Sequence, residues 1–343
     1  MLRGLAVLPF CVVTLSVEVL ALPQANSNPG VKSNARILIL GGGVAGITAA
    51  RTLYCNGLHN FLIIEARDEI GGRLRSHTFG DGTTIELGAN WVQGTQAGDG
   101  PSNPIWDLAR KHKVRTVFND YSSIATHDGS GLVNYTNLVD NATDNLDKIT
   151  ELAGKRVADN LVDLSARAGY SLVGAKPQSP HDKVAEYFNF DWEYGDTPSA
   201  SSLAATGLVR VSQGGFSDEA RLSIDQRGFK VIITEEAKEF LRPSQLLLSS
   251  TVRTIGYTHS GVRVTLANGT WISGDYVLCT FSLGMLQNDD VKFEPDLPDW
   301  KMEAIQSMSM TTYTKVFLQF SRKFWFDTEA SLPSSPLKRP VSY

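Results

Sequence analysis

Two short apolar runs and the turn between them form the first clear pattern in the chain. Residues 36–40 (Arg-Ile-Leu-Ile-Leu) and residues 61–64 (Phe-Leu-Ile-Ile) are continuous apolar runs, typical of strands buried on both faces of a parallel sheet. Between them, residues 47–55 carry apolar side chains at helical spacing. The pattern therefore predicts a strand–helix–strand unit in which a glycine-rich turn, residues 41–46, joins the first strand to the helix.

The pattern of apolar positions changes twice further along the chain. Residues 104–190 contain few strand signals and two segments of helical period, residues 105–112 and 145–168. From residue 253 the alternation of strands returns, interrupted by turns rich in Gly, Asn and Ser. The strands predicted in this part are 253–257, 261–266, 271–272, 276–279 and 315–320. The order predicts an α/β protein with a helical insertion.

The glycine-rich turn has the spacing of a dinucleotide-binding loop. Gly41, Gly43 and Gly46 satisfy G-x-G-x-x-G, in which the glycines permit the tight turn, the approach of a pyrophosphate and the close packing of the helix. Glu65 ends the second strand, where a carboxylate can accept hydrogen bonds from ribose hydroxyls and disfavours NADP. Three glycines in six residues also make an ordinary turn. Here the strand, the helix and the acidic residue all stand in the expected order, which favours dinucleotide binding.

A second pair of glycines narrows the choice among dinucleotide cofactors. Gly71-Gly72-Arg73 offers another close backbone approach and a cation for phosphate. The run from residue 36 to Arg73 resembles the extended FAD fingerprint of glutathione-reductase-like flavoproteins, and most closely the flavin-containing amine oxidase family. Residues 85–94 resemble that family's next flavin-contacting segment, although a turn glycine and a core tryptophan would explain parts of it. The residues that the resemblance assigns to FAD are Gly41, Gly43, Val44, Ala45, Gly46, Glu65, Ala66, Gly72, Arg73, Gly88, Ala89, Asn90, Trp91 and Val252.

Four later segments resemble the polyamine oxidase branch of this family. They are residues 187–194, 225–229, 250–253 and 313–320, the last followed by Phe324-Trp325. The resemblance implies a Rossmann-like FAD-binding domain interleaved with an α+β substrate domain that is incomplete at its C-terminus. The boundaries we expect are a signal peptide at 1–21, a linker at 22–35, FAD-binding segments at 36–103 and 215–295, and substrate-binding segments at 104–214 and 296–343.

Lys315 is the candidate catalytic residue. It stands among apolar and aromatic residues of a predicted strand, where burial would be costly and would lower its pKa. From the pattern alone, a lysine on an edge strand facing water is the simpler interpretation. The resemblance reverses this preference, because the matching lysine of the family holds a water at the flavin N5 and assists the reaction.

Three further residues match positions on the family's substrate side. Glu193 matches a position that can hold a substrate nitrogen, and Tyr313 matches an aromatic residue of the substrate tunnel. A solvated charge and a core tyrosine are the simpler interpretations of these two. Gln93 stands where plant-type enzymes have Glu, and the loss of that charge weakens the attraction for a distant ammonium group. This change favours acetylated or monoamine substrates.

The implied activity is FAD-dependent oxidation of a polyamine-type amine, with hydride transfer to flavin N5 and reduction of oxygen to hydrogen peroxide. An L-amino-acid oxidase or a monoamine oxidase is the alternative among enzymes, since all share the N-terminal fingerprint. The family's C-terminal flavin-binding segment, a Gly-Glu motif with a downstream aromatic residue, does not occur in this sequence. A truncated chain without turnover is therefore the alternative of another class.

The first 21 residues predict export. Arg3 precedes a short apolar stretch that Glu18 interrupts, which favours a cleaved signal peptide over a stable membrane span. Three N-x-[ST] sequons, at Asn134, Asn141 and Asn268, fit a secreted glycoprotein. Cys55 and Cys279 remain after cleavage; both lie in apolar segments, which favours buried free thiols over a disulfide framework.

Composition changes this picture little. A net charge of −4 over 343 residues does not predict nucleic-acid binding and is too weak to indicate cationic partners. No metal-ligand spacing occurs among Cys and His. The expected partners are a small amine and oxygen.

Overall fold

A four-stranded parallel sheet contains both strands of the predicted strand–helix–strand unit. The computed structural model describes residues 35–121, 123–211 and 215–324. In the sheet, β10 (Leu246–Leu247), β2 (Phe61–Ile64), β1 (Ile37–Leu40) and β14 (Tyr276–Cys279) lie in that order, with Ile37 opposite both Phe61 and Tyr276. The predicted strands at 61–64 and 276–279 are therefore confirmed to the residue.

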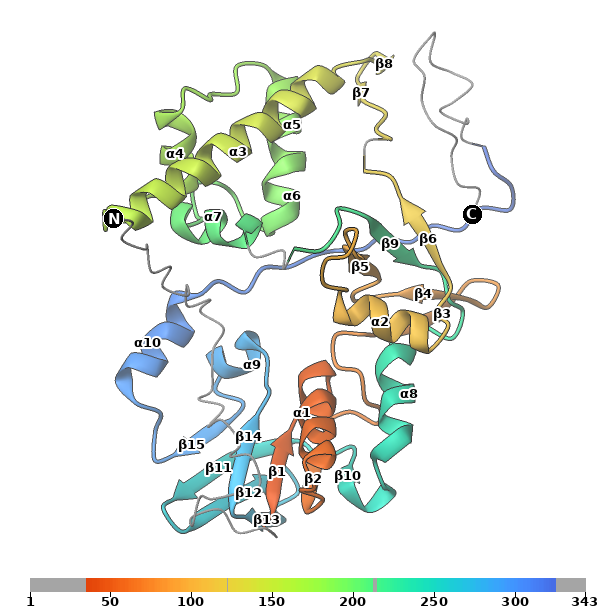
Figure 1. The fold of residues 1–343 in the computed structure, drawn as a ribbon, viewed down its shortest axis with the longest axis vertical. Coiled ribbons are helices and arrows are strands. Elements are labelled where there is room, and N and C mark those ends of the chain that lie inside the picture. Colours follow the sequence, from red (N-terminus) through yellow and green to blue (C-terminus); the bar gives the residue numbers. More distant parts are fainter. Residues whose placement is uncertain (1–34, 122, 212–214, 325–343) are drawn as a thin grey trace, which may run out of the picture.

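The two faces of this sheet are covered by different layers, as Figure 1 shows. Ile39 points to one face, where it packs with α1 (Val44–Cys55) and α8 (Val231–Phe240). Leu38 and Leu40 point to the other face and pack with residues of a second sheet. That sheet has the order β13 (Trp271–Gly274), β12 (Gly261–Leu266), β11 (Val252–Thr258), β15 (Lys292–Glu294). Burial on both faces explains why β1 and β2 are apolar at every position.

A smaller antiparallel sheet lies beyond the glycine turn. Its order is β5 (Trp91–Gln93), β9 (Ala220–Ser223), β6 (Thr116–Asn119), and a hairpin of β3 (Ser76–Phe79) and β4 (Thr83–Glu86) precedes it. Helix α2 (Pro104–Lys111) packs against α8. It begins one residue before the predicted segment 105–112, because the Asn103 side chain caps it by accepting a hydrogen bond from Ile105 N at 2.9 Å.

The helical insertion forms a separate bundle with its own core. It comprises α3 (Thr136–Ala158), α4 (Ala166–Leu172), α5 (Pro180–Asn189), α6 (Asp191–Tyr194) and α7 (Leu203–Val211). Tyr170, Phe190 and Leu203 are fully buried between them. The remaining elements are β7 (His127–Asp128), β8 (Gly131–Leu132), η1 (Pro243–Gln245), α9 (Leu283–Gln287) and α10 (Asp299–Ser307).

Two predicted elements are wrong. The helical period over 145–168 is interrupted after Ala158, where Asn160 adopts φ 53° and Leu161 N donates to Arg156 O at 2.9 Å. This closing turn ends α3, and α4 begins only at Ala166. Residues 315–320 form no strand, because their backbone pairs with no described strand, although the Phe317 ring lies 6.2 Å from that of Phe79 in β3. Val316 and Leu318 are accordingly 76% and 74% exposed.

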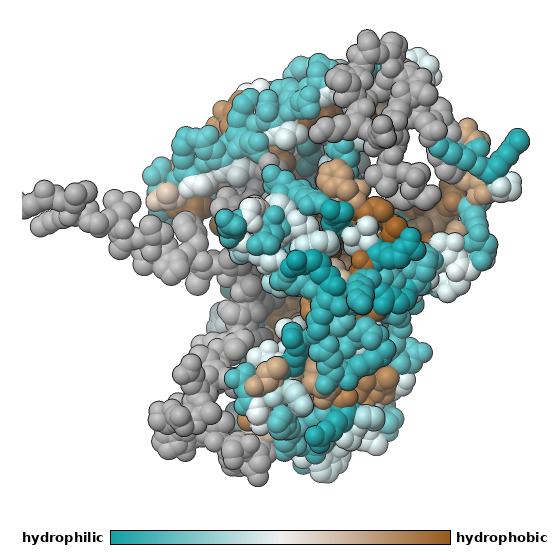
Figure 2. Space-filling view, turned by 45° about the vertical axis from the view of Figure 1, so that its right-hand side comes forward, coloured by the Kyte–Doolittle hydropathy of each residue, from teal (hydrophilic) through white to brown (hydrophobic). Residues whose placement is uncertain are grey.

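The surface shows the usual mixture for a globular fold. On the face drawn in Figure 2, hydrophilic residues predominate and hydrophobic ones gather in patches between them. Among the described residues, no helix combines the length and apolar character needed to cross a membrane. The predicted signal peptide, most of the linker and residues 325–343 lie outside the described residues. The α/β class is confirmed.

Candidate functional site: a glycine cradle and the Lys315 cluster

The turn after β1 depends on the absence of side chains at Gly41 and Gly46. Gly41 has φ +106°, and a Cβ there would lie 2.7 Å from Thr280 Oγ1. A Cβ at position 46 would lie 1.9 Å from the carbonyl oxygen of Gly41. The first turn of α1 therefore packs directly on the loop that leaves β1, and only glycine fits at either position.

The amino end of α1 is open to an anion. Its N-cap is Gly43, no side chain caps the helix, and its first turn contains no acidic residue. The free N–H groups and the positive end of the helix dipole can therefore serve a ligand. Val44 and Ala45 lie in this first turn, next to the opening. This geometry fits the pyrophosphate of a dinucleotide.

The Gly71–Gly72 loop forms the other wall of this cradle. Gly71 N donates to Gly42 O at 2.9 Å, and a Cβ on Gly72 would lie 3.0 Å from the Cα of Gly43. Two backbone segments without side chains thus meet face to face. Arg73 follows, is exposed, and forms no ion pair within the described ranges, so its guanidinium is available to a phosphate.

Glu65 is buried at the end of β2 and is held by its own loop. Its Oε2 accepts from Gly42 N at 2.6 Å and its Oε1 accepts from Arg67 N at 2.9 Å. Each oxygen keeps a second lone pair for a ribose hydroxyl. Ser250 N donates to the backbone carbonyl of Glu65 at 2.9 Å, which brings the 250–252 segment beside the backbone of this residue. Val252 itself is buried in the core, whereas Ala66 is exposed.

Lys315 reaches back to the segment that follows β4. Its Nζ donates to Glu86 O at 3.0 Å, to Gly88 O and to Asn90 Oδ1 at 3.1 Å. It also lies 5.8 Å from the centre of the Trp91 ring. Although the residue is exposed overall, its ammonium group turns inward to these acceptors. Burial lowers the pKa of Lys315, an effect that the Glu86 carboxylate opposes.

The acceptors of Lys315 are tied to the glycine cradle. A Cβ on Gly88 would lie 1.7 Å from Arg73 O, and Ala89 N donates to the same oxygen at 3.4 Å. The segment 88–91 therefore runs directly against the residue that follows Gly72. The indole N–H of Trp91 is buried and has no hydrogen-bond partner in the part of the chain that the structure describes. An unsatisfied buried donor beside Lys315 fits a polar ligand group at this place.

Tyr313 and Glu193 lie together, and Tyr313 is close to Lys315 in sequence. The Tyr313 hydroxyl is 2.8 Å from both Trp192 O and Glu193 O, to which it can donate. Burial raises the pKa of Tyr313, and the Glu193 carboxylate adds to this effect. Glu193 itself is exposed on α6. Gln93 is exposed at the end of β5, where its Nε2 lies 3.4 Å from the Tyr121 hydroxyl.

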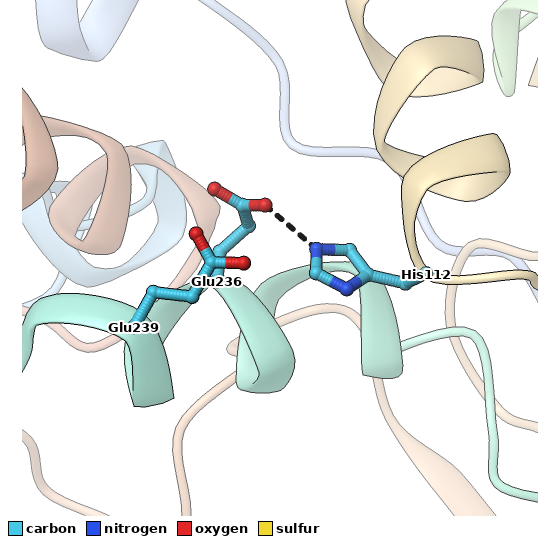
Figure 3. A group of neighbouring side chains, drawn as sticks. All are labelled: His112, Glu236 and Glu239. Carbon is cyan, nitrogen blue, oxygen red and sulfur yellow. Dashed lines mark hydrogen bonds and ion pairs between the residues drawn. The ribbon is translucent and has the colours of Figure 1, made fainter.

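The sequence reasoning missed a charged cluster that joins three helices. Glu236 of α8, only 2% exposed, accepts from His112 Nε2 at 2.6 Å (Figure 3). It also accepts from Lys111, and Arg51 Nε of α1 lies 3.1 Å from its Oε2. Glu239 also accepts from Lys111 at 2.8 Å. Because Lys111 occupies the space between the two carboxylates, this cluster is an ion-pair network rather than an open ligand site.

The two cysteines differ in their exposure. Cys279 ends β14 and is partly buried, and burial raises the pKa of its thiol to about 11. Cys55 is exposed at the end of α1, so the prediction of a buried thiol is wrong there. The helical spacing places Leu53 on the core side and turns Cys55 outward.

Comparison with known proteins agrees with this geometry. The sequence model of the flavin containing amine oxidoreductases matches residues 44–340, and the chain belongs to this family. FAD is the cofactor that membership implies, and the cradle described above fits it.

Individual relatives point to one branch of the family. Polyamine oxidase 7 of Oryza sativa subsp. japonica is 32% identical over 328 residues, 91% of this chain and 68% of that protein. Polyamine oxidase 1 of Zea mays is 34% identical over 311 residues, 84% of this chain and 61% of that protein. A putrescine oxidase bound to putrescine has a similar fold, with a TM-score of 0.60, 18% identity, and coverage of 80% of this chain and 63% of that one. The chain thus spans about two thirds of the length of these relatives.

Proposed function

We propose that this protein is an FAD-dependent amine oxidase that acts on a polyamine-type amine with oxygen as the electron acceptor. The observation that carries the proposal is the attachment of Lys315 to the segment 86–91, which itself packs against the FAD cradle. Family membership and the similarity to polyamine oxidases support the reaction class. When bound, FAD would accept a hydride from the amine α-carbon at N5 and pass the two electrons to oxygen, which gives hydrogen peroxide.

The proposed cofactor contacts divide between the two ends of the cradle. The N–H groups at the start of α1 and the Arg73 guanidinium would hold the pyrophosphate. Glu65 would accept hydrogen bonds from the ribose, using the lone pairs that Gly42 and Arg67 leave free. Gly88, Ala89, Asn90 and Trp91 would line the ring end, and the unsatisfied indole N–H of Trp91 supports a polar group there.

Lys315 would act as a positioning and proton-handling group beside the reacting carbon. Its ammonium group is held by carbonyl and amide oxygens, and its lowered pKa makes the neutral form more accessible. The neutral amine has a lone pair, which can accept a hydrogen bond and then a proton from a water molecule at this place. This water could hydrolyse the iminium product.

Glu193 and Gln93 carry the proposal for substrate preference. Glu193 is exposed next to Tyr313 and could hold a substrate ammonium group, while Gln93 is neutral. The neutral amide at Gln93 supports a preference for amines with one distant cation or with an acetylated end, over a substrate with several free ammonium groups. We also propose export through a signal peptide at residues 1–21.

The first experiment asks whether the chain holds the cofactor. The purified chain is incubated with FAD and freed of excess by gel filtration, and its visible absorbance is then recorded for the bands of bound flavin. A flavin spectrum is expected. A colourless protein would contradict the enzyme proposal and support a chain without turnover.

Peroxide release then tests the substrate. Spermine, spermidine, their acetylated forms, putrescine, monoamines and L-amino acids are compared at equal concentration. The proposal expects acetylated polyamines or diamines to be preferred. Peroxide release from amino acids alone would instead support an amino-acid oxidase.

Lys315→Met tests the catalytic role. We expect flavin reduction or reoxidation in stopped-flow measurements to slow by about 10²-fold or more, in line with the loss of a proton-transfer group. The matched control is Lys292→Met, which removes a 68% exposed lysine of β15. Equal rates in wild type and Lys315→Met would remove Lys315 from the mechanism.

A further inference from the structure

A second hollow lies at the edge of the parallel sheet opposite to the glycine cradle. It has a volume of about 480 Å³. Arg36 immediately precedes β1 and Phe61 begins β2, and the amino ends of these parallel strands meet at this edge. The residues that line it are Arg36, His59, Asn60, Phe61, Leu62, Arg242, Ser244 and Gln245. We call it the Arg36–Arg242 pocket.

The lining of this pocket is cationic. It contains two guanidinium groups, an imidazole and a hydroxyl, and no carboxylate. Within the described ranges, neither guanidinium forms an ion pair; the neighbouring Asp275 carboxylate instead accepts from the backbone N–H of Arg36 at 2.8 Å. The N–H donors of both guanidinium groups are therefore left without an anionic partner among these residues.

Hydrogen bonds fix the backbone segments that form the walls of the pocket. Gln245 Nε2 donates to His59 O at 2.7 Å, and Gln245 Oε1 accepts from Arg242 N at 3.1 Å. Ile37 N donates to Asn60 O at 3.0 Å. The His59 ring packs edge-on against Tyr54, with 4.7 Å between the ring centres. The three segments that carry the donors are thus held in place before any ligand arrives, which lowers the entropy cost of binding.

We propose that the Arg36–Arg242 pocket binds a phosphate or sulfate group. Planar guanidinium groups donate pairs of parallel hydrogen bonds to such tetrahedral oxyanions, and the Ser244 hydroxyl can add a further donor. The pocket is larger than a single oxyanion, so it also has room for the first atoms of an ester. This proposal is independent of the amine oxidase activity, because the pocket and the cradle lie at opposite edges of the sheet.

The test is isothermal titration of the full chain at constant ionic strength, with FAD in excess so that the open end of α1 is occupied. The ligands are inorganic phosphate, inorganic sulfate and glycerol 3-phosphate. We expect binding of at least one of them to weaken about tenfold or more in the double variant Arg36→Gln/Arg242→Gln, since each lost charge-assisted pair contributes strongly. Tighter binding of glycerol 3-phosphate than of phosphate would identify an ester as the source of the group.

Two further variants separate the loss of this anion site from a general change in surface charge. Arg253→Gln/Arg263→Gln removes the same charge from exposed positions of β11 and β12, and we expect it to bind like wild type. Ser244→Asp leaves both arginines in place but adds a carboxylate to the lining, and we expect it to abolish binding. No measurable binding of any ligand by the wild type, or equal binding by wild type and Arg36→Gln/Arg242→Gln, would overturn the proposal.

Discussion

At the scale of single residues, Gly46 is the most constrained position of the cradle. A Cβ there would lie 1.9 Å from Gly41 O, so Gly46→Ala must displace the first turn of α1 from the loop. We expect FAD affinity to fall by about tenfold or more, because the N–H groups of that turn no longer point at the pyrophosphate. Fluorescence titration of FAD measures the change.

The matched control for Gly46→Ala is Gly154→Ala. Gly154 lies inside α3, and a Cβ there meets nothing within 4 Å. We expect unchanged FAD affinity and a gain in stability of up to about 1 kcal/mol from the better helix former. A wild-type affinity in Gly46→Ala would show that the cradle does not bind the cofactor.

Asp225 is a buried carboxylate whose two oxygens both accept hydrogen bonds. It accepts from Arg227 Nε at 2.9 Å, from Arg227 Nη2 at 2.7 Å and from Arg115 N at 2.9 Å. Hydrogen bonds from Arg227 hold the pKa of Asp225 well below its usual range. Asp225→Asn should destabilise the fold by about 1–3 kcal/mol, because the charge paired with Arg227 and one of the two acceptor oxygens are lost.

The effect of Asp225 should depend on pH with a definite sign. Because its folded-state pKa is depressed, its stabilisation is present above the unfolded pKa of about 3.9 and disappears as the pH falls toward the folded value. Urea unfolding at pH 7 and at pH 3 should therefore give a larger difference between wild type and Asp225→Asn at pH 7. The exposed Asp99→Asn serves as control. A difference that grows on acidification would contradict this role of Asp225.

At the scale of elements, Glu236 connects α1, α2 and α8. Burial alone would raise its pKa, but hydrogen bonds from Lys111 and His112 and the nearby Arg51 lower it. Glu236→Gln should cost about 1–3 kcal/mol, less than a fully buried pair, because Lys111 and Arg51 are about half exposed and can be hydrated. Chemical denaturation measures it.

Glu239→Gln provides the comparison within the same cluster. Glu239 is 51% exposed and shares only Lys111, so the expected loss is below about 1 kcal/mol. If both variants lost the same stability, the contribution would come from Lys111 alone rather than from the connection of three helices.

The sequence predicts well those elements whose apolar side chains pack directly against adjacent layers of the fold. β2 is apolar throughout because layers cover both of its faces, and the bounds of β2 and of the edge strand β14 could be read directly from their apolar runs. The end of α3 was missed because Asn160 stops the helix through its backbone conformation, which leaves the apolar period intact. The prediction of a strand at 315–320 was wrong, because the apolar pattern of a segment does not show whether another strand pairs with its backbone.

The sequence likewise identified some residues of the candidate site and missed the contacts of others. Its glycines were found because each is required by a backbone contact close in sequence, as at Gly41 and Gly46. The partners of Lys315 could not be found from local pattern, since Glu86 and Asn90 lie more than two hundred residues away. The Glu236 cluster was missed for the same reason, because its cations come from two other helices.

At the scale of the whole molecule, the predicted export can be tested through the sequons. Asn134 and Asn268 are exposed at turns, where each side chain accepts from the hydroxyl of its own threonine, at 2.9 Å and 2.7 Å. Asn141 lies within α3, and Thr143 of its sequon donates to Asn189. We expect the chain secreted by a eukaryotic host to lose mass on endoglycosidase treatment.

Single variants should assign the glycans. Asn134→Gln and Asn268→Gln are each expected to remove one step of the mass shift, whereas removal of residues 1–21 should leave the whole chain unmodified. Secreted protein that carries no glycan, or protein retained inside the cell, would count against the export proposal.

The segment that carries Tyr313 and Lys315 contacts residues that lie more than one hundred positions earlier in the sequence and are synthesised earlier. Tyr313 contacts α6 and Lys315 contacts the segment after β4. The ring centres of Phe317 and Phe79 are 6.2 Å apart. During synthesis, the glycine cradle can close once β14 has left the ribosome, whereas these contacts wait for residues 313–317. The nascent chain would thus pass through a stage in which the sheet and the glycine cradle are folded, while the contacts of Tyr313, Lys315 and Phe317 are not yet formed. Free FAD in the compartment of synthesis could then act as a folding aid before it acts as a cofactor.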